Sequence, residues 1–197
     1  MEAIQINSHK NKLIEGPLLL KPNIFNDNRG YFYESWNKKS LEKLVFENLN
    51  FVQDNHSESK LGVLRGMHFQ IPPKAQSKLV RCTQGEIFDV IVDLRINSKT
   101  FGEWYGVYLN ENNKFQLWIP KGFAHGFLSL KNYSEVQYKT NEYWDKSAER
   151  SLKWDDEEIN IKWPLKIDKK YLEILTNEKD SNCLDFNEIK KKEYFLN

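Results

Sequence analysis

Cysteine is scarce in this chain, and the two cysteines lie far apart. Cys82 and Cys183 occur among 197 residues and stand in no metal-ligand spacing. Neither a disulfide framework nor a zinc-finger type of site is therefore indicated. So few cysteines are typical of a protein from a reducing compartment.

An excess of one charge and a long hydrophobic run are also lacking. Lysine and arginine number 29 against 28 aspartates and glutamates, a net charge of +1, which leaves no basic footprint for nucleic acid. No segment approaches the ~18 apolar residues of a membrane span. Residues Met1–Gln5 show no basic region followed by an apolar run, so we expect no signal peptide. These absences predict a cytoplasmic protein that binds neither nucleic acid nor membrane.

Short segments with strand character fill most of the chain. Residues 86–94 alternate between two faces, and further segments of this kind, separated by turn residues, cover 18–22, 31–36, 51–53, 78–83, 104–109, 115–119, 127–130 and 136–140. Many short strands at regular spacing predict an all-β sandwich or barrel. The Gly-x-Gly-x-x-Gly and P-loop motifs of nucleotide-binding α/β folds are absent. One helix is predicted over about 38–46, because Leu41, Leu44 and Val45 recur at helical spacing.

A single domain is expected over residues 1–197, because the sequence has no internal repeat and no low-complexity linker. Its core is predicted to span about 18–165. The strand pattern weakens beyond the core, and residues 166–197 are predicted to form a C-terminal extension. Within the extension we expect a short helix over 171–175, and residues 187–195 are either helical or irregular.

Polar side chains occur within a largely apolar stretch from Gly62 to Lys78. Arg65, His68 and Gln70 lie there between leucine, methionine and phenylalanine. A buried cation, imidazole or amide needs a partner or a function. One such histidine is most often a satisfied core residue. However, His125 lies in a similar apolar, glycine-rich stretch, and two histidines in such settings indicate a shared site.

The spacing around these two histidines resembles the two short motifs of the cupin superfamily, whose members are double-sheet β barrels. The motifs are Gly-x5-His, ending at His68, and Pro-x-Gly-x-x-His, ending at His125. In metal-binding cupins a second histidine and a glutamate follow the first motif. Here Gln70 takes the place of that histidine, and residues 71–78 contain no carboxylate. Imidazole and amide alone make a poor divalent-metal site, so we expect a jelly-roll barrel with a few short helices and no metal.

A more specific resemblance runs in order from about Leu20 to Asp180. It is carried by the segments Gln53–Ser57, Gly62–Gln70, Lys78–Cys82, Gly85–Val90, Gln116–Pro120, Gly122–Phe127 and Tyr138–Lys139. These segments resemble the family of dTDP-4-dehydrorhamnose 3,5-epimerases. The resemblance implies a cofactor-free, cupin-like jelly roll that acts on a nucleotide-linked 4-keto-6-deoxy sugar. It also implies a homodimer in which an N-terminal strand is swapped into the partner.

The resemblance assigns a catalytic role to four residues. The C4 carbonyl of such a sugar acidifies the protons on C3 and C5, so epimerisation needs a base, an enolate stabiliser and an acid. His68 is implied to be the base, and Asp180 the carboxylate that orients it. Lys78 is implied to lie near the C4 oxygen, and Tyr138 to be the acid on the opposite face. From the strand pattern alone, Tyr138 would be expected to pack in the core.

The resemblance also implies a set of substrate-binding residues. A diphosphate is bound by guanidinium, ammonium and imidazole groups, and thymine by amide or carboxylate partners and an aromatic platform. The matching positions are Arg29, Arg65, Lys78, His125, Glu149 and Lys179 for the diphosphate and sugar, and Glu34, Gln53, Asp54, Asn55 and Trp144 for the base. Trp144 stands where the family usually has tyrosine, which enlarges the platform.

The leading hypothesis is an epimerase that inverts C3 and C5 of dTDP-4-dehydro-6-deoxy-D-glucose to give dTDP-4-dehydro-L-rhamnose, for rhamnose biosynthesis. A first alternative is a mono-epimerase of C3 or C5, or an epimerase of another nucleotide 4-keto sugar. A second is a metal-dependent cupin, against which Gln70 and the missing glutamate argue. A third is a non-catalytic sugar-binding cupin, which does not explain why base, acid and enolate stabiliser match together.

Overall fold

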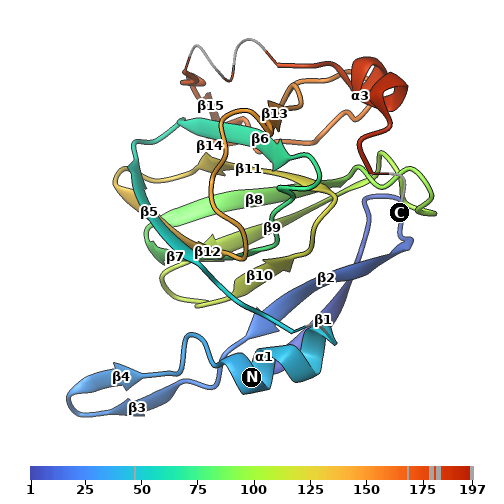
Figure 1. Ribbon diagram of the computed structural model, residues 1–197. Coiled ribbons are helices and arrows are strands. Elements are labelled where there is room, and N and C mark those ends of the chain that lie inside the picture. The colour runs from blue at the N-terminus through green and yellow to red at the C-terminus, as the bar shows by residue number, and fades with distance from the viewer. Residues whose placement is uncertain (47, 168, 178–179, 181–182, 196–197) are drawn as a thin grey trace.

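Two antiparallel sheets form the body of the protein in the computed structural model (Figure 1), which describes residues 1–197 except 47, 168, 178–179, 181–182 and 196–197. The six-stranded sheet has the order β1-β2-β10-β7-β12-β5, with bounds β1 Glu2–Asn7, β2 Leu13–Lys21, β10 Gln116–Ile119, β7 Lys78–Gln84, β12 Ser134–Thr140 and β5 Gln53–Ser59. The five-stranded sheet has the order β13-β6-β11-β8-β9, with bounds β13 Glu149–Ser151, β6 Leu64–Gln70, β11 Phe123–Ser129, β8 Glu86–Asp93 and β9 Trp104–Asn110. The prediction of an all-β fold with short helices is confirmed.

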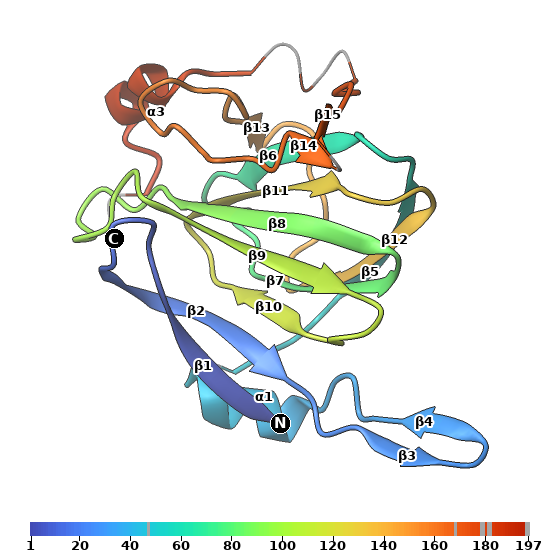
Figure 2. The same cartoon turned by 180° about the vertical axis from the view of Figure 1, so that it is seen from behind.

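The five-stranded sheet separates two apolar layers. Because successive strand residues point to opposite faces, β8 directs Ile87 and Ile91 between the two sheets and Phe88 and Val90 to the other side. The inner layer contains side chains of both sheets. The outer layer is closed by the chain beyond β13, whose Phe186 packs into it. Figure 2 shows this C-terminal segment lying over β6 and β11.

Two short elements follow β2. The strands β3 (Phe25–Asp27) and β4 (Gly30–Phe32) form a hairpin that projects from the body (Figure 1). Its side chains Phe25, Tyr31 and Phe32 are exposed. The predicted helix is confirmed as α1 (Lys38–Val45). It begins after Asn37, whose side chain accepts a hydrogen bond from the Ser40 amide. Its Leu41 packs in an apolar cluster on the outer face of the six-stranded sheet.

The C-terminal segment contains β14 (Lys166–Ile167), β15 (Lys170–Tyr171) and the helix α3 (Phe186–Lys192). The short helix expected over 171–175 is wrong. This part of the chain is extended instead, because the Leu175 amide donates to the Gly62 carbonyl and the Leu175 carbonyl accepts from Leu64. Neither helix in the described part of the chain is long and apolar enough to cross a membrane.

The expected start of the core near residue 18 also differs from the structure. The first strand of the six-stranded sheet is β1, and β2 begins at Leu13. β1 pairs with β2, so that Ile4 lies opposite Leu19, and Ile6 is buried. The strand escaped prediction because Glu2–Asn7 contains only three apolar residues, of which only Ile6 is fully buried.

A close approach of β6 and β11 fixes the geometry of the interior. A Cβ atom on Gly66 would lie 2.5 Å from the Gly126 Cα and 2.8 Å from the His125 carbonyl oxygen. Gly66 also has a φ of +126°, which side chains rarely tolerate. Glycine at this position lets the two strands pair so that His68 faces His125 in the register.

Candidate functional site

A pocket lies between the two sheets, lined by residues of β5, β7 and β12 from one sheet and of β6 and β13 from the other. The lining residues are Gln53, Asn55, His68, Phe69, Gln70, Gln76, Lys78, Tyr138, Thr140, Trp144 and Glu149. Strand alternation explains this assembly, because every second residue of each strand faces the interior. Seven residues predicted for the site therefore meet in one cavity: Gln53, Asn55, His68, Lys78, Tyr138, Trp144 and Glu149.

The His68 side chain, which lines this pocket, pairs with the carboxylate of Asp180. The His68 Nε2 lies 2.5 Å from the Asp180 Oδ1. The Asp180 side chain is 1% exposed, whereas that of His68 is 27% exposed and reaches the pocket. A carboxylate can only accept here, so Nε2 carries the proton, and in a neutral ring Nδ1 then has the lone pair. This arrangement suits a base that removes a proton from a ligand.

Lys78 and Tyr138 project into the same pocket from neighbouring strands. The buried Lys78 Nζ lies 3.4 Å from the His68 carbonyl oxygen, which directs a cation toward the histidine. Burial raises the pKa of Tyr138, the negative charge of Glu149 raises it further, and the positive charge of Arg65 lowers it. The Tyr138 hydroxyl thus stays protonated near neutral pH and is able to donate.

A second histidine–aspartate pair lies deeper between the sheets. The His125 Nε2 is 2.7 Å from the Asp89 Oδ1, and both side chains are buried. Burial lowers the pKa of His125, Asp89 opposes this, and the nearby Lys78 and His68 lower it further. His125 does not line the pocket itself. Its place in the β6–β11 register, opposite His68, keeps it next to the pocket.

Arg65 also faces the interior from β6, next to the pocket. Its Nε donates to the Ser59 hydroxyl at 3.1 Å and its Nη2 to the Glu58 carbonyl oxygen at 3.0 Å. These bonds orient the half-buried guanidinium along the inner side of β5. The positive charge of Arg65 lowers the pKa of Tyr138, so Arg65 lies within electrostatic range of that hydroxyl.

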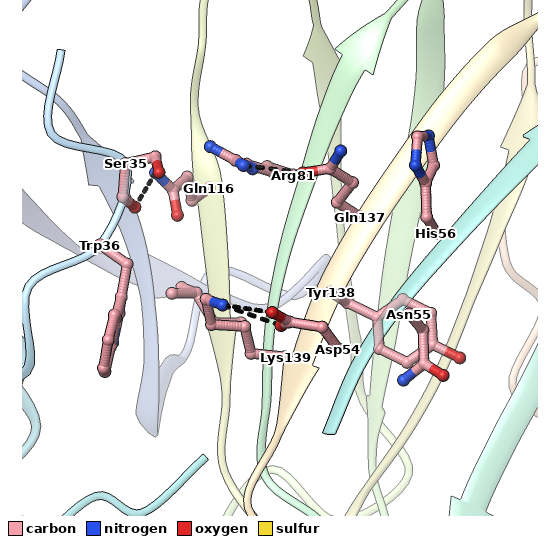
Figure 3. A pocket seen from close by; sticks show the side chains of 11 residues that line it. Ser35, Trp36, Asp54, Asn55, His56, Arg81, Gln116, Gln137, Tyr138 and Lys139 are labelled. Carbon is pink, nitrogen blue, oxygen red and sulfur yellow. Dashed lines mark hydrogen bonds and ion pairs between the residues drawn. The ribbon is translucent and has the colours of Figure 1, made fainter. Parts of the chain in front are cut away.

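Asp54 differs from its neighbours Gln53 and Asn55 because it points to the outer face of the six-stranded sheet. There the Lys139 Nζ lies 2.8 Å from both carboxylate oxygens (Figure 3). This outer face carries a separate hollow, lined among others by Trp36 and Arg81. Asp54 is therefore outside the pocket that contains His68.

Three further predicted residues lie away from the pocket or outside the described part of the chain. Arg29 is in the turn of the β3–β4 hairpin, where it pairs with Asp27. Glu34 accepts a hydrogen bond from the Asn37 side chain at the start of α1. Lys179 is not among the described residues.

Comparison with known proteins identifies the family. The family profile described as dTDP-4-dehydrorhamnose 3,5-epimerase matches residues 11–188. The chain belongs to this epimerase family. It is 55% identical over 147 residues to the dTDP-4-dehydrorhamnose 3,5-epimerase of Salmonella typhimurium LT2, a match that covers 75% of this chain and 80% of the relative. The relative from Methanothermobacter thermautotrophicus is 46% identical over 169 residues, covering 86% and 89%.

Solved structures of the epimerase family share the fold. The dTDP-6-deoxy-D-glucose-3,5-epimerase of Legionella pneumophila Philadelphia 1, in complex with dTDP-4-keto-L-rhamnose, has a TM-score of 0.89 and 39% identity, with 100% of this chain and 99% of that chain covered. A 3'-monoepimerase of Streptomyces bikiniensis, in complex with dTDP-quinovose, has a TM-score of 0.80 and 28% identity, with 92% and 94% covered. The cupin-like jelly roll that the resemblance implied is thereby confirmed.

Sequence reasoning about the epimerase site missed Asp89 and the partners of Gln70. Asp89 had a signal, because it is an aspartate between Ile87 and Ile91 on the inward face of β8. Gln70 was expected to be a buried amide in need of a partner, and its amide bonds three backbone groups. Among the described residues, no three His, Cys, Asp or Glu side chains form a group that could hold a metal ion. The absence of a metal from the working enzyme stays a prediction.

Proposed function

We propose that this protein inverts C3 and C5 of dTDP-4-dehydro-6-deoxy-D-glucose, giving dTDP-4-dehydro-L-rhamnose, without a cofactor and in the cytoplasm. The observation that carries the proposal is the His68–Asp180 pair in a pocket that also contains Lys78 and Tyr138. The relatives from Salmonella and Methanothermobacter, which are 55% and 46% identical to this chain, support the proposal. Both are named as dTDP-4-dehydrorhamnose 3,5-epimerases.

The proposed chemistry uses one residue for each part of the reaction. His68, oriented by Asp180 through Nε2, takes the proton from C3 or C5 on its Nδ1. The electron pair of the broken C–H bond moves onto the C4 oxygen, where the charge of Lys78 stabilises the enolate. Tyr138 then donates its proton to the opposite face of the same carbon. Solvent afterwards removes the proton from His68 and restores that of Tyr138.

The substrate-binding roles are part of the same proposal. Arg65, His125, Glu149 and Lys179 are proposed to bind the diphosphate and sugar. Gln53, Asn55 and Trp144 are proposed to contact the thymine ring, whereas Asp54, which points to the outer face, is not. Support comes from the donors that Arg65 offers beside the pocket and from the indole of Trp144, which is 54% exposed at the pocket mouth. Indole offers a wide face for stacking a pyrimidine.

We further propose a homodimer in which the N-terminal part of one copy contacts the other. The β3–β4 hairpin supports this, because Phe25, Tyr31 and Phe32 expose apolar surface that a partner would bury. Arg29 and Glu34, which lie outside the pocket of their own chain, would serve the partner's pocket in such a dimer. Sedimentation equilibrium of the purified protein tests the dimer directly.

The function is tested by incubating the protein with dTDP-4-dehydro-6-deoxy-D-glucose in heavy water and following the sugar by NMR. Deuterium at both C3 and C5 with inverted configuration supports the proposal. Deuterium at one carbon identifies a mono-epimerase, the activity named for the Streptomyces bikiniensis relative. Tight binding without any exchange would contradict an enzymatic role. A His68→Asn variant is the control, because it keeps the pocket but removes the base.

A further inference from the structure

Gln70 ends β6 as a buried amide whose hydrogen-bonding groups all face backbone. Gln70 is only 4% exposed. Its Nε2 donates to the carbonyl oxygens of Lys74 at 2.7 Å and Tyr143 at 3.2 Å. Its Oε1 accepts from the Asp145 amide at 2.7 Å. One primary amide thus joins two loops at the pocket, which requires two N–H donors and an acceptor on the same group.

The loop from Asn141 to Asp145, here called the platform loop, carries Trp144. It has no regular secondary structure, yet each of its residues has a hydrogen bond to a neighbouring element. Besides the two bonds of Gln70, the Gln76 Nε2 donates to the Glu142 carbonyl oxygen at 2.8 Å. The Asn141 side chain accepts from the Ser77 amide at 2.7 Å, and the Trp144 amide donates to the Gln53 Oε1 at 3.0 Å.

We propose that Gln70 is a positioning residue that holds the platform loop, and with it the Trp144 indole, in place before a ligand binds. An exposed loop normally loses conformational freedom when it contacts a ligand, which weakens binding. Gln70 removes part of that cost because the loop backbone is already fixed at Tyr143 and Asp145. It acts on substrate affinity through Trp144. The effect on substrate affinity rests on the proposed function. The effect on the platform loop rests only on the hydrogen bonds of Gln70.

The alternative role for Gln70 is direct contact with the substrate, since its residue also lines the pocket. The two roles differ in the ligand-free protein. A positioning role predicts that the Asp145 amide exchanges faster with solvent when Gln70 is replaced, because that amide loses its acceptor. A purely contacting residue would leave the exchange of the platform loop unchanged.

The test compares Gln70→Met with Gln116→Met as a matched control. Methionine has a similar length but no amide. Gln116 is also buried and also donates to a backbone carbonyl, that of Ser35, at the hollow on the outer face (Figure 3), and this bond does not involve the platform loop. Gln76→Met is the milder second variant, because it removes only the bond to Glu142 and remains informative if Gln70→Met does not fold.

Two measurements are made on each variant. Hydrogen exchange of the ligand-free protein, followed at the amides of Trp144 and Asp145, is expected to accelerate about tenfold in Gln70→Met and not to change in Gln116→Met. Steady-state kinetics is expected to show a KM about tenfold higher with kcat altered by less than about threefold. Unchanged exchange, or a loss of kcat at constant KM, would overturn the proposal.

The exchange measurement needs no substrate, so it separates this inference from the proposed function. If the wild-type protein shows no turnover, the affinity for dTDP measured by calorimetry replaces KM. Faster exchange with an unchanged dTDP affinity would then overturn the link from Gln70 through Trp144 to the ligand.

Discussion

His125 and Asp89 form a 2.7 Å hydrogen bond between the two sheets, where both side chains are buried. Both residues belong to the five-stranded sheet, on the adjacent strands β8 and β11. Burial lowers the pKa of His125, the charge of Asp89 raises it, and the nearby Lys78 and His68 lower it. The Asp89 carboxylate thereby gives the buried imidazole its hydrogen-bond partner.

Replacing Asp89 by alanine is expected to lower the free energy of unfolding by about 3 kcal/mol, because it leaves a buried imidazole without its partner. Asp89→Asn should cost clearly less, since the amide oxygen still accepts from Nε2. Urea denaturation of both variants at pH 7.5 measures the difference. Equal stability of Asp89→Ala and the wild type would show that the pair contributes nothing.

The stability of the protein should fall as the pH drops below about 7. The pKa of His125 is lowered by burial, so the unfolded chain takes up a proton at its ordinary pKa of about 6.5 before the folded protein does. Unfolding is therefore favoured increasingly from that pH downward. Urea titrations at pH 7.5 and 5.5 are expected to show a smaller loss for His125→Gln than for the wild type, and an identical loss would contradict the assignment.

Tyr138→Phe is expected to separate proton removal from inversion. The variant keeps His68 but has no hydroxyl to donate from the opposite face, so epimerisation should slow by about 10²–10⁴-fold. His68 can still remove a proton and return deuterium to the same face. NMR in heavy water should thus show exchange with retained configuration, whereas inversion at the wild-type rate would exclude Tyr138 as the acid.

Asp180→Asn is expected to reduce kcat by about 10²–10⁴-fold with little change in KM, because His68 loses the carboxylate that orients its ring and stabilises the charge it gains on taking up a proton. Asp185→Asn is the matched control in the same segment. Asp185 caps α3, and asparagine caps equally well, so this variant should keep both stability and kcat. Comparable kcat values for the two variants would remove Asp180 from the mechanism.

Cys82 should resist alkylation in the folded protein. Burial raises the pKa of its thiol to about 12, so hardly any reactive thiolate exists at pH 8, and the side chain is inaccessible. Mass spectrometry of peptides after iodoacetamide treatment is expected to find Cys82 unmodified in buffer and fully modified in urea. Rapid modification in buffer would mean that the interior near Cys82 opens readily.

The strand β8 could be predicted from the sequence, whereas β5 could not. The alternation of Phe88, Val90 and Val92 with Ile87 and Ile91 predicts β8. β5 contains no apolar residue, since its inward side chains, including Gln53 and Asn55, line or adjoin the pocket. A strand whose buried face is built for a ligand lacks the pattern on which strand prediction depends.

The site was predictable only where the resemblance supplied it. Nothing in the spacing joins His68 to Asp180, which is 112 residues further along the chain. The role of Gln70 could not be predicted at all, because its partners Lys74, Tyr143 and Asp145 come together only when two loops meet in the folded protein. Tertiary contacts of this kind leave no local signal.

The late position of Asp180 has a consequence for protein synthesis. The last strand of the two sheets ends at Ser151, so a ribosome has synthesised every strand of the barrel before it adds this carboxylate. A nascent or prematurely terminated chain can therefore contain His68, Lys78 and Tyr138 without the carboxylate that contacts His68 in the folded protein. Phe186, which closes the outer apolar layer, follows shortly after Asp180. Under the proposed mechanism, a chain that ends before Asp180 would lack both the carboxylate and Phe186, so activity would require synthesis through these two residues.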